Sequence, residues 1–156
     1  MRDRDETGRA RNARPRDAYG RPLPRGEEGE ERVPDDYAPT PSEALTEAQR
    51  LLDADRPFHA HEVLEAAWKS APEPERELWQ GLAQLAVGFT HVRRGNAQGA
   101  RSLLRRAADR VGAYDPAPHT IAATALAAHA RALADRVEHH GLDGIEDHDL
   151  APKLTT

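Results

Sequence analysis

Residues 57–70, PFHAHEVLEAAWKS, carry the residue types most able to do chemistry in this sequence. At about 100° of rotation per residue, one side of a helix would carry Phe58, His61, Glu62, Glu65 and Trp68. Carboxylates three residues apart lie roughly 5 to 6 Å apart at Cβ and repel each other, so a desolvated pair needs a cation or a shared proton. The two aromatic residues indicate that this side of the helix faces the hydrophobic core, yet it also carries a polar cluster.

A second polar stripe follows on the next helical segment, at intervals of 4, 3 and 4: Gln80, Gln84, Val87 and His91. Gly81 and Gly88 lie on the same segment, and we expect their missing side chains to let the two helices pack closely in antiparallel orientation. That packing would place His61, Glu62 and Glu65 against Gln84 and His91.

Two interpretations of this cluster remain open. In the first, the imidazoles and glutamine amides bond the carboxylates in a structural network that needs no cofactor. In the second, one divalent metal ion, iron, manganese or zinc, is held by the ligand set His61, Glu62, Glu65 and His91, with His59 as a substitute for His61. The order H-x-H-E-x-x-E is neither the metalloprotease H-E-x-x-H nor a repeated Glu-x-x-His.

The elements that must position these residues are helical. Thr40, Pro41 and Glu43 make a capping box that starts a first helix, which ends near Ala54. Asp55 is expected to cap a second helix that runs to about 71. The third is a core helix with an apolar period of Leu78, Leu82, Leu85, Phe89 and Val92.

Two more helices follow. Gly95 and Asn96 form a helix break, with Asn96 able to cap a fourth helix that ends at Gly112. Pro116 and Pro118 are expected to open a fifth helix that closes before 141. The pattern predicts an all-α fold, a compact bundle of about five helices in antiparallel hairpins, over 40–141. Residues 142–156 are expected to be mostly irregular.

Composition excludes several classes of protein. The chain has 156 residues and no cysteine, so disulfides, zinc fingers and thiol nucleophiles are ruled out. No apolar run could span a membrane, and the N-terminus lacks a signal-peptide core, so a cytoplasmic location is expected by elimination. The net charge of −5 argues against nucleic acid as a partner. Residues 1–39 are predicted to be a disordered charged tail.

Three ordered blocks give the sequence a family resemblance. The blocks are F-x-A-H-E-V-L-E-x-x-W from Phe58, Q-G-L-x-Q-L-A from Gln80, and R-G-N-x-x-G-A from Arg94, with His91 between the last two. Together they resemble the family called domain of unknown function 309. The resemblance implies a compact all-helical fold and brings no established activity. Its blocks fall on the residues of the polar cluster and on the helix-break residues Gly95 and Asn96.

The sequence thus favours a non-catalytic structural or protein-interaction module whose His/Glu/Gln network is structural. We expect the domain to bind a protein partner or to self-associate. The alternative is a metal-binding protein or metal-dependent hydrolase that uses His61, Glu62, Glu65 and His91.

Overall fold

A computed structural model of the chain describes residues 3–4, 10–11 and 37–156. The predicted tail, 1–39, lies almost entirely outside the described residues. Within its first part, strand β1 (Asp3–Arg4) pairs antiparallel with β2 (Ala10–Arg11). No helix in the described part of the chain is long and apolar enough to cross a membrane.

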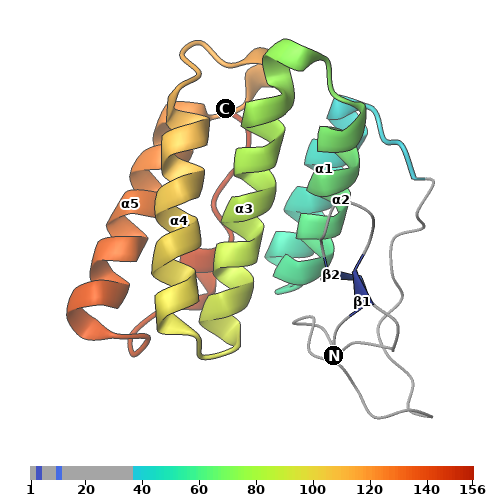
Figure 1. Cartoon of the computed structure of the whole chain (residues 1–156). Helices are drawn as coiled ribbons and strands as arrows, with labels where there is room; N and C mark the ends of the chain where they lie inside the picture. Colours follow the sequence, from blue (N-terminus) through green and yellow to red (C-terminus); the bar gives the residue numbers. More distant parts are fainter. Residues whose placement is uncertain (1–2, 5–9, 12–36) are drawn as a thin grey trace.

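Residues 37–156 form five α-helices (Figure 1): α1 (Pro41–Asp53), α2 (Pro57–Ser70), α3 (Arg76–Arg93), α4 (Ala97–Gly112) and α5 (Ala123–His140). Short 3-10 turns follow α2 (η1, Glu73–Glu75), precede α5 (η2, Pro118–Thr120) and lie near the C-terminus (η3, Asp147–Leu150). Each helix packs on the next in sequence, with α3 in the middle. The predicted all-α bundle of antiparallel hairpins is confirmed.

Two helix starts follow their local sequence signals. The Thr40 hydroxyl accepts a hydrogen bond from the Glu43 amide at 3.1 Å, and the Thr40 amide donates to the Glu43 carboxylate at 2.9 Å, which completes the predicted capping box. The Asn96 side chain accepts from the Gly99 amide at 3.0 Å, after Gly95 turns the chain with φ 79°.

Two other helix starts differ from expectation. Asp55 does not cap α2, because its backbone adopts φ 58° and its carboxylate accepts a hydrogen bond from Arg93 Nε at 3.0 Å. The N-cap is Arg56, without a side-chain cap. The fifth helix begins at Ala123 and not at the prolines, because His119 and Thr120 have positive φ values that interrupt helical geometry.

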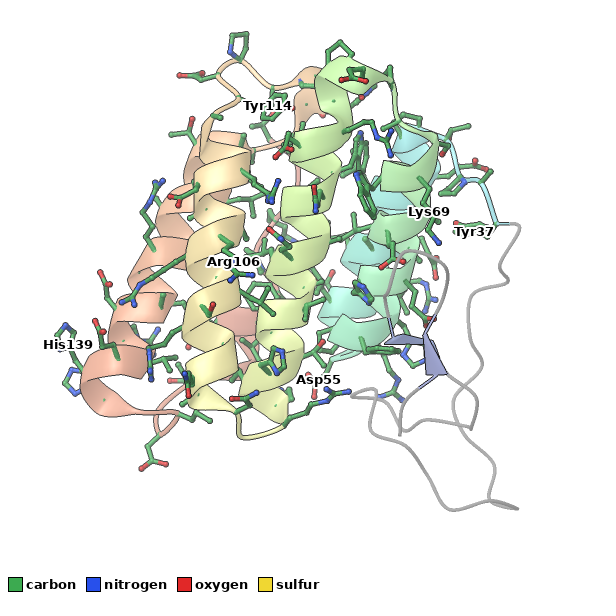
Figure 2. All side chains as sticks on the ribbon, viewed as in Figure 1. Tyr37, Asp55, Lys69, Arg106, Tyr114 and His139 are labelled. Carbon is green, nitrogen blue, oxygen red and sulfur yellow. The ribbon has the colours of Figure 1, made fainter. Side chains whose placement is uncertain are left out.

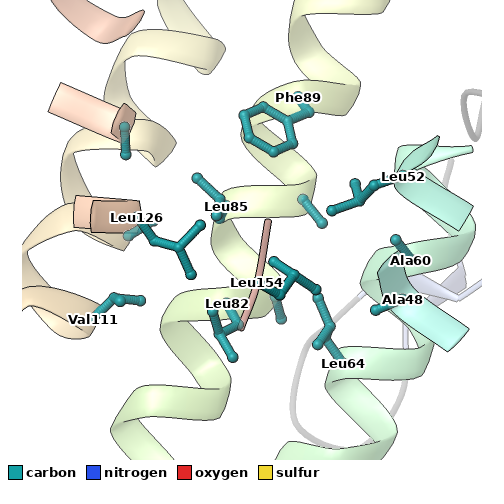
Figure 3. Packing of buried hydrophobic residues seen from close by; sticks show 14 of the residues in the cluster. Ala48, Leu52, Ala60, Leu64, Leu82, Leu85, Phe89, Val111, Leu126 and Leu154 are labelled. Carbon is teal, nitrogen blue, oxygen red and sulfur yellow. The ribbon is translucent and has the colours of Figure 1, made fainter. Parts of the chain in front are cut away.

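The core contains the two buried aromatic side chains of α3, Trp79 and Phe89, together with leucines from every helix. Figure 3 shows the side chains that meet at its centre. Gly81 and Gly88 face α4 and not α2: a Cβ atom on Gly81 would lie 2.8 Å from Val111 Cγ2, and one on Gly88 would lie 2.9 Å from Leu104 Cδ2. The expected role of these glycines in the approach of α2 is therefore wrong.

The last segment of the chain runs back across the bundle. Residues 142–156 contain only the short η3 turn and one isolated β-bridge, between Ile121 and Thr155. Leu150 and Leu154 are nevertheless buried, at 3% and 1% exposed, and both belong to the hydrophobic core. We call residues 145–156 the C-terminal strap.

Candidate functional site on helix α2

Helix α2 buries a stripe of small and aliphatic residues: Ala60, Val63, Leu64 and Ala67. Pro57 starts the helix, because a proline at the first position removes an amide that has no partner there. The side carrying Phe58, His61, Glu62, Glu65 and Trp68, which we call the α2 face, is only partly buried. The conflict seen in the sequence is thereby resolved, since the aromatic and acidic residues lie at the edge of the core.

His61 and Glu65 form the central pair of the α2 face. His61 Nε2 lies 2.9 Å from Glu65 Oε2, and both side chains are 19% exposed. A nitrogen that faces a carboxylate is the protonated one, so in the neutral imidazole Nδ1 is a hydrogen-bond acceptor. The ammonium group of Lys69, on the exposed side of α2, lies 3.6 Å from the other oxygen of Glu65 (Figure 2).

Two buried acceptor atoms stand out, one on α2 and one on α3, two helices that pack on each other. His61 Nδ1 and Gln84 Oε1 are both shielded from solvent, and neither has a hydrogen-bond partner among the residues that the structure describes. A buried polar atom without a partner costs about 1 to 3 kcal/mol, and native proteins contain few of them. The polar network predicted here is therefore incomplete within the described part of the molecule.

The two aromatic residues of the α2 face each contact a nitrogen-containing side chain. The guanidinium carbon of Arg76, on α3, lies 5.9 Å from the centre of the Trp68 ring, a cation–π distance. The Phe58 ring lies 5.5 Å from the imidazole of His61. Partly buried aromatic rings thus flank the acceptors at both ends of the face.

Two residues of the predicted cluster have hydrogen-bond partners on or next to α4. Gln80 turns to α4, where its side-chain oxygen accepts a hydrogen bond from Arg110 at 3.2 Å. His91 lies at the corner between α3 and α4, with its Nδ1 atom 3.2 Å from the side-chain nitrogen of Asn96. The helix-break residue Asn96 therefore caps α4 and contacts His91 as well.

Within 3–4, 10–11 and 37–156, no group of three or more His, Asp or Glu side chains is arranged to hold a metal ion. The predicted ligand set His61, Glu62, Glu65 and His91 is not assembled as one site in this structure. Besides its contact with His61, the Glu65 carboxylate forms an ion pair with the ammonium group of Lys69. Sequence reasoning missed Lys69 and Arg76, although the Glu65 to Lys69 spacing of four residues is a usual helical ion pair.

The fold is an all-helical bundle. Its second helix carries a face with several hydrogen-bond acceptors between two partly buried aromatic residues. Residues 45–103, from α1 into α4, match the family model described as Domain of unknown function (DUF309). This match confirms the family resemblance of the sequence. The α2 face lies wholly within the matched residues.

One curated relative is similar over part of this region. A stretch of 48 residues is 46% identical to the uncharacterized protein YpuF of Bacillus subtilis (strain 168). The stretch covers 30% of this chain and 28% of YpuF, so the matched region spans under a third of that relative. No solved structure matches the chain.

Proposed function

We propose that this domain is a non-catalytic protein-interaction module whose α2 face binds an arginine side chain of a partner segment. The observation that carries the proposal is the pair of buried acceptors, His61 Nδ1 and Gln84 Oε1, which have no partner among the described residues. Donors brought by a partner would complete this network and remove its desolvation cost.

The chemistry of the face selects the kind of donor. His61 Nδ1, Gln84 Oε1 and the Glu65 carboxylate all accept hydrogen bonds, and Glu65 carries negative charge. Guanidinium supplies five N–H donors in a planar fork, keeps its charge at all relevant pH values and is more weakly hydrated than ammonium. Arginine therefore fits these acceptors better than lysine does.

The aromatic rings support the same assignment. The guanidinium carbon of Arg76 lies 5.9 Å from the centre of the Trp68 ring, which supports a face that suits guanidinium groups. Phe58, at the other end of the face, is also partly exposed. Arginine side chains stack on aromatic rings, and such contacts add about 0.5 to 1 kcal/mol at exposed sites.

The metal alternative is supported less well, because the imidazole nitrogen nearest to Glu65 is engaged by that carboxylate. A divalent ion would need three or more converging ligands, and the described residues present no such group. Metal analysis of protein purified without an affinity tag separates the two functions. Stoichiometric iron, manganese or zinc would contradict the interaction proposal.

The direct test is fluorescence anisotropy with a labelled glycine pentapeptide that carries one central arginine. The matched control peptide carries citrulline, which has the shape of arginine without its charge. We expect saturable binding of the arginine peptide and none of the citrulline peptide. The substitution Glu65→Gln should raise Kd about tenfold, as expected for the loss of a charged hydrogen bond.

Glu138→Gln, on the exposed side of α5, is the control variant, because Glu138 bonds Arg105 far from the α2 face in sequence. It should leave Kd unchanged. Equal binding of both peptides, or equal effects of the two variants, would reject the arginine site.

A further inference from the structure

The C-terminal strap covers a part of the bundle surface, which we call the groove, through buried leucines and main-chain hydrogen bonds. Leu154 points among Leu64, Leu82, Leu85 and Leu126, which come from α2, α3 and α5 (Figure 3). Leu150, four residues earlier, is the second buried side chain of the strap. Lys153, between them, is exposed. The strap thus inserts two leucines, four residues apart, into the hydrophobic core.

The main chain of the strap is bound as well. The Ala122 amide donates to the Leu154 carbonyl and the Thr156 amide donates to the Thr120 carbonyl, each at 2.9 Å, around the antiparallel bridge between Ile121 and Thr155. An extended segment just before α5 therefore pairs with the strap as a neighbouring strand would.

The Gln49 side chain of α1 also forms hydrogen bonds with the strap backbone. Gln49 Nε2 donates to the Pro152 carbonyl at 3.1 Å, and Gln49 Oε1 accepts from the Leu154 amide at 2.9 Å. The primary amide thus bonds an acceptor and a donor of the strap main chain at once. These bonds depend on backbone atoms and tolerate any side chain at 153.

Main-chain pairing that provides affinity, combined with pockets for particular side chains, is how domains recognise extended peptides. We propose that this groove is a peptide-binding site which the C-terminal strap occupies in cis. In trans it takes an extended segment of another protein that carries two leucine-sized apolar residues four apart. The site is separate from the α2 face and does not depend on the function proposed there.

The attachments of the strap suit an exchangeable occupant. Gly141 and Gly144, both with positive φ, connect α5 to the strap, and a glycine adopts that geometry without strain. In the flanking ion pair of Arg93 with Asp147, the carboxylate on the strap is 92% exposed, and a pair with an exposed partner contributes little. The pair of Arg136 with the buried Asp149 is the stronger attachment, and it must break when the strap leaves. Release of the strap would unwind no α-helix.

Hydrogen exchange of the full, unmodified chain tests whether the strap opens independently. The reporters are the amides of Leu154, Thr156 and Ala122, because each donates a hydrogen bond between the strap and the rest of the bundle. If the strap opens by itself, these amides should exchange at least about 100-fold faster than the core amides of α3, because local opening costs less than global unfolding. Exchange at the same rate as α3 would show that the strap is a permanent part of the core and would overturn the proposal.

Recognition in trans is tested with a synthetic peptide of residues 145–156 added to the full chain carrying Leu154→Ala. We expect the lowered Tm of this variant to rise with peptide concentration, as for any ligand of the folded state. The control peptide carries Leu150→Ser and Leu154→Ser and should have no effect. The added substitution Gln49→Ala should weaken the response at least about fivefold, because both backbone contacts are lost.

Two results would count against this proposal. Equal effects of the two peptides, or no effect of either, would reject peptide recognition by the groove. Recovery without peptide, accompanied by a dimer that increases with protein concentration, would assign the groove to a second copy of this chain and overturn its assignment to a foreign segment. If the Leu154→Ala variant does not fold, the exchange measurement on the unmodified chain decides the proposal.

Discussion

At the scale of single residues, Gly81 determines how closely α3 approaches α4. An added Cβ would lie 2.8 Å from Val111 Cγ2 and 2.9 Å from Arg110 Cβ, and neither atom is the mobile end of a long side chain. The sequence shows that α3 has a close neighbour on its glycine side and cannot show which helix that is. The interpretation in favour of α2 was wrong because both helices flank α3.

We predict that Gly81→Ala lowers the free energy of unfolding by about 1 to 2 kcal/mol. Overpacking typically costs about 1 to 3 kcal/mol, and the higher helix propensity of alanine recovers part of that cost. Urea unfolding measures the change, with Ser102→Ala on the exposed side of α4 as the control. A Gly81→Ala protein as stable as the control would contradict the close contact.

The identity of the polar face was readable at the residue scale, but its partners were not. Helical spacing correctly grouped His61 with Glu65, because residues four apart in a helix are neighbours. Gln80 of α3 was grouped with the same polar stripe, but its side chain bonds Arg110 on α4. Side-chain direction on α3 depends on packing against two helices at once, and a single helical period does not encode that.

At the scale of elements, local signals were reliable and long-range ones were not. The caps at Thr40 and Asn96 need only residues three positions apart, so the sequence contains the whole interaction. Asp55 instead binds Arg93, 38 residues away, and the segment before α5 bridges to Thr155, 34 residues after Ile121. The strap escaped prediction because two leucines in an acidic, proline-containing segment show no period.

One buried carboxylate makes the strap sensitive to acid. Burial raises the pKa of Asp149, but the hydrogen bonds from the Glu146 amide and Arg136 outweigh it and hold the pKa below its ordinary value. A carboxyl group with a lowered folded pKa contributes stability above its unfolded pKa, about 3.9, and loses it as the pH falls through the folded value.

We therefore predict that Asp149→Asn lowers Tm at pH 7 and that the difference from the unmodified protein shrinks as the pH falls below about 4. Thermal unfolding across pH 7 to 3 provides the measurement, and Asp143→Asn, in the exposed loop after α5, is the matched control. A constant difference at every pH would show that the charge of Asp149 does not stabilise the strap.

At the scale of the whole molecule, the bundle is a chain of hairpins in which every helix packs on its neighbours in sequence. Such a fold is readable from sequence because helical periods and breaks already give the order of contacts. The strap is the exception, since it joins α1 to the segment before α5 through Gln49 and Ala122. Both proposed binding sites rest on contacts that the order of helices does not reveal.

The central claim, that the α2 face binds arginine through its buried acceptors, is tested most directly by NMR titration of the unmodified protein with the arginine pentapeptide. The side-chain amide of Gln84 and the imidazole nitrogens of His61 are the reporters. Gln80 provides an internal control on the same helix, because its side chain bonds Arg110 on α4. We predict that Gln84 and His61 Nδ1 shift together along one saturable curve while the Gln80 amide stays in place. Shifts of Gln80 as large as those of Gln84, or no shift of His61 Nδ1 at saturation, would contradict the claim.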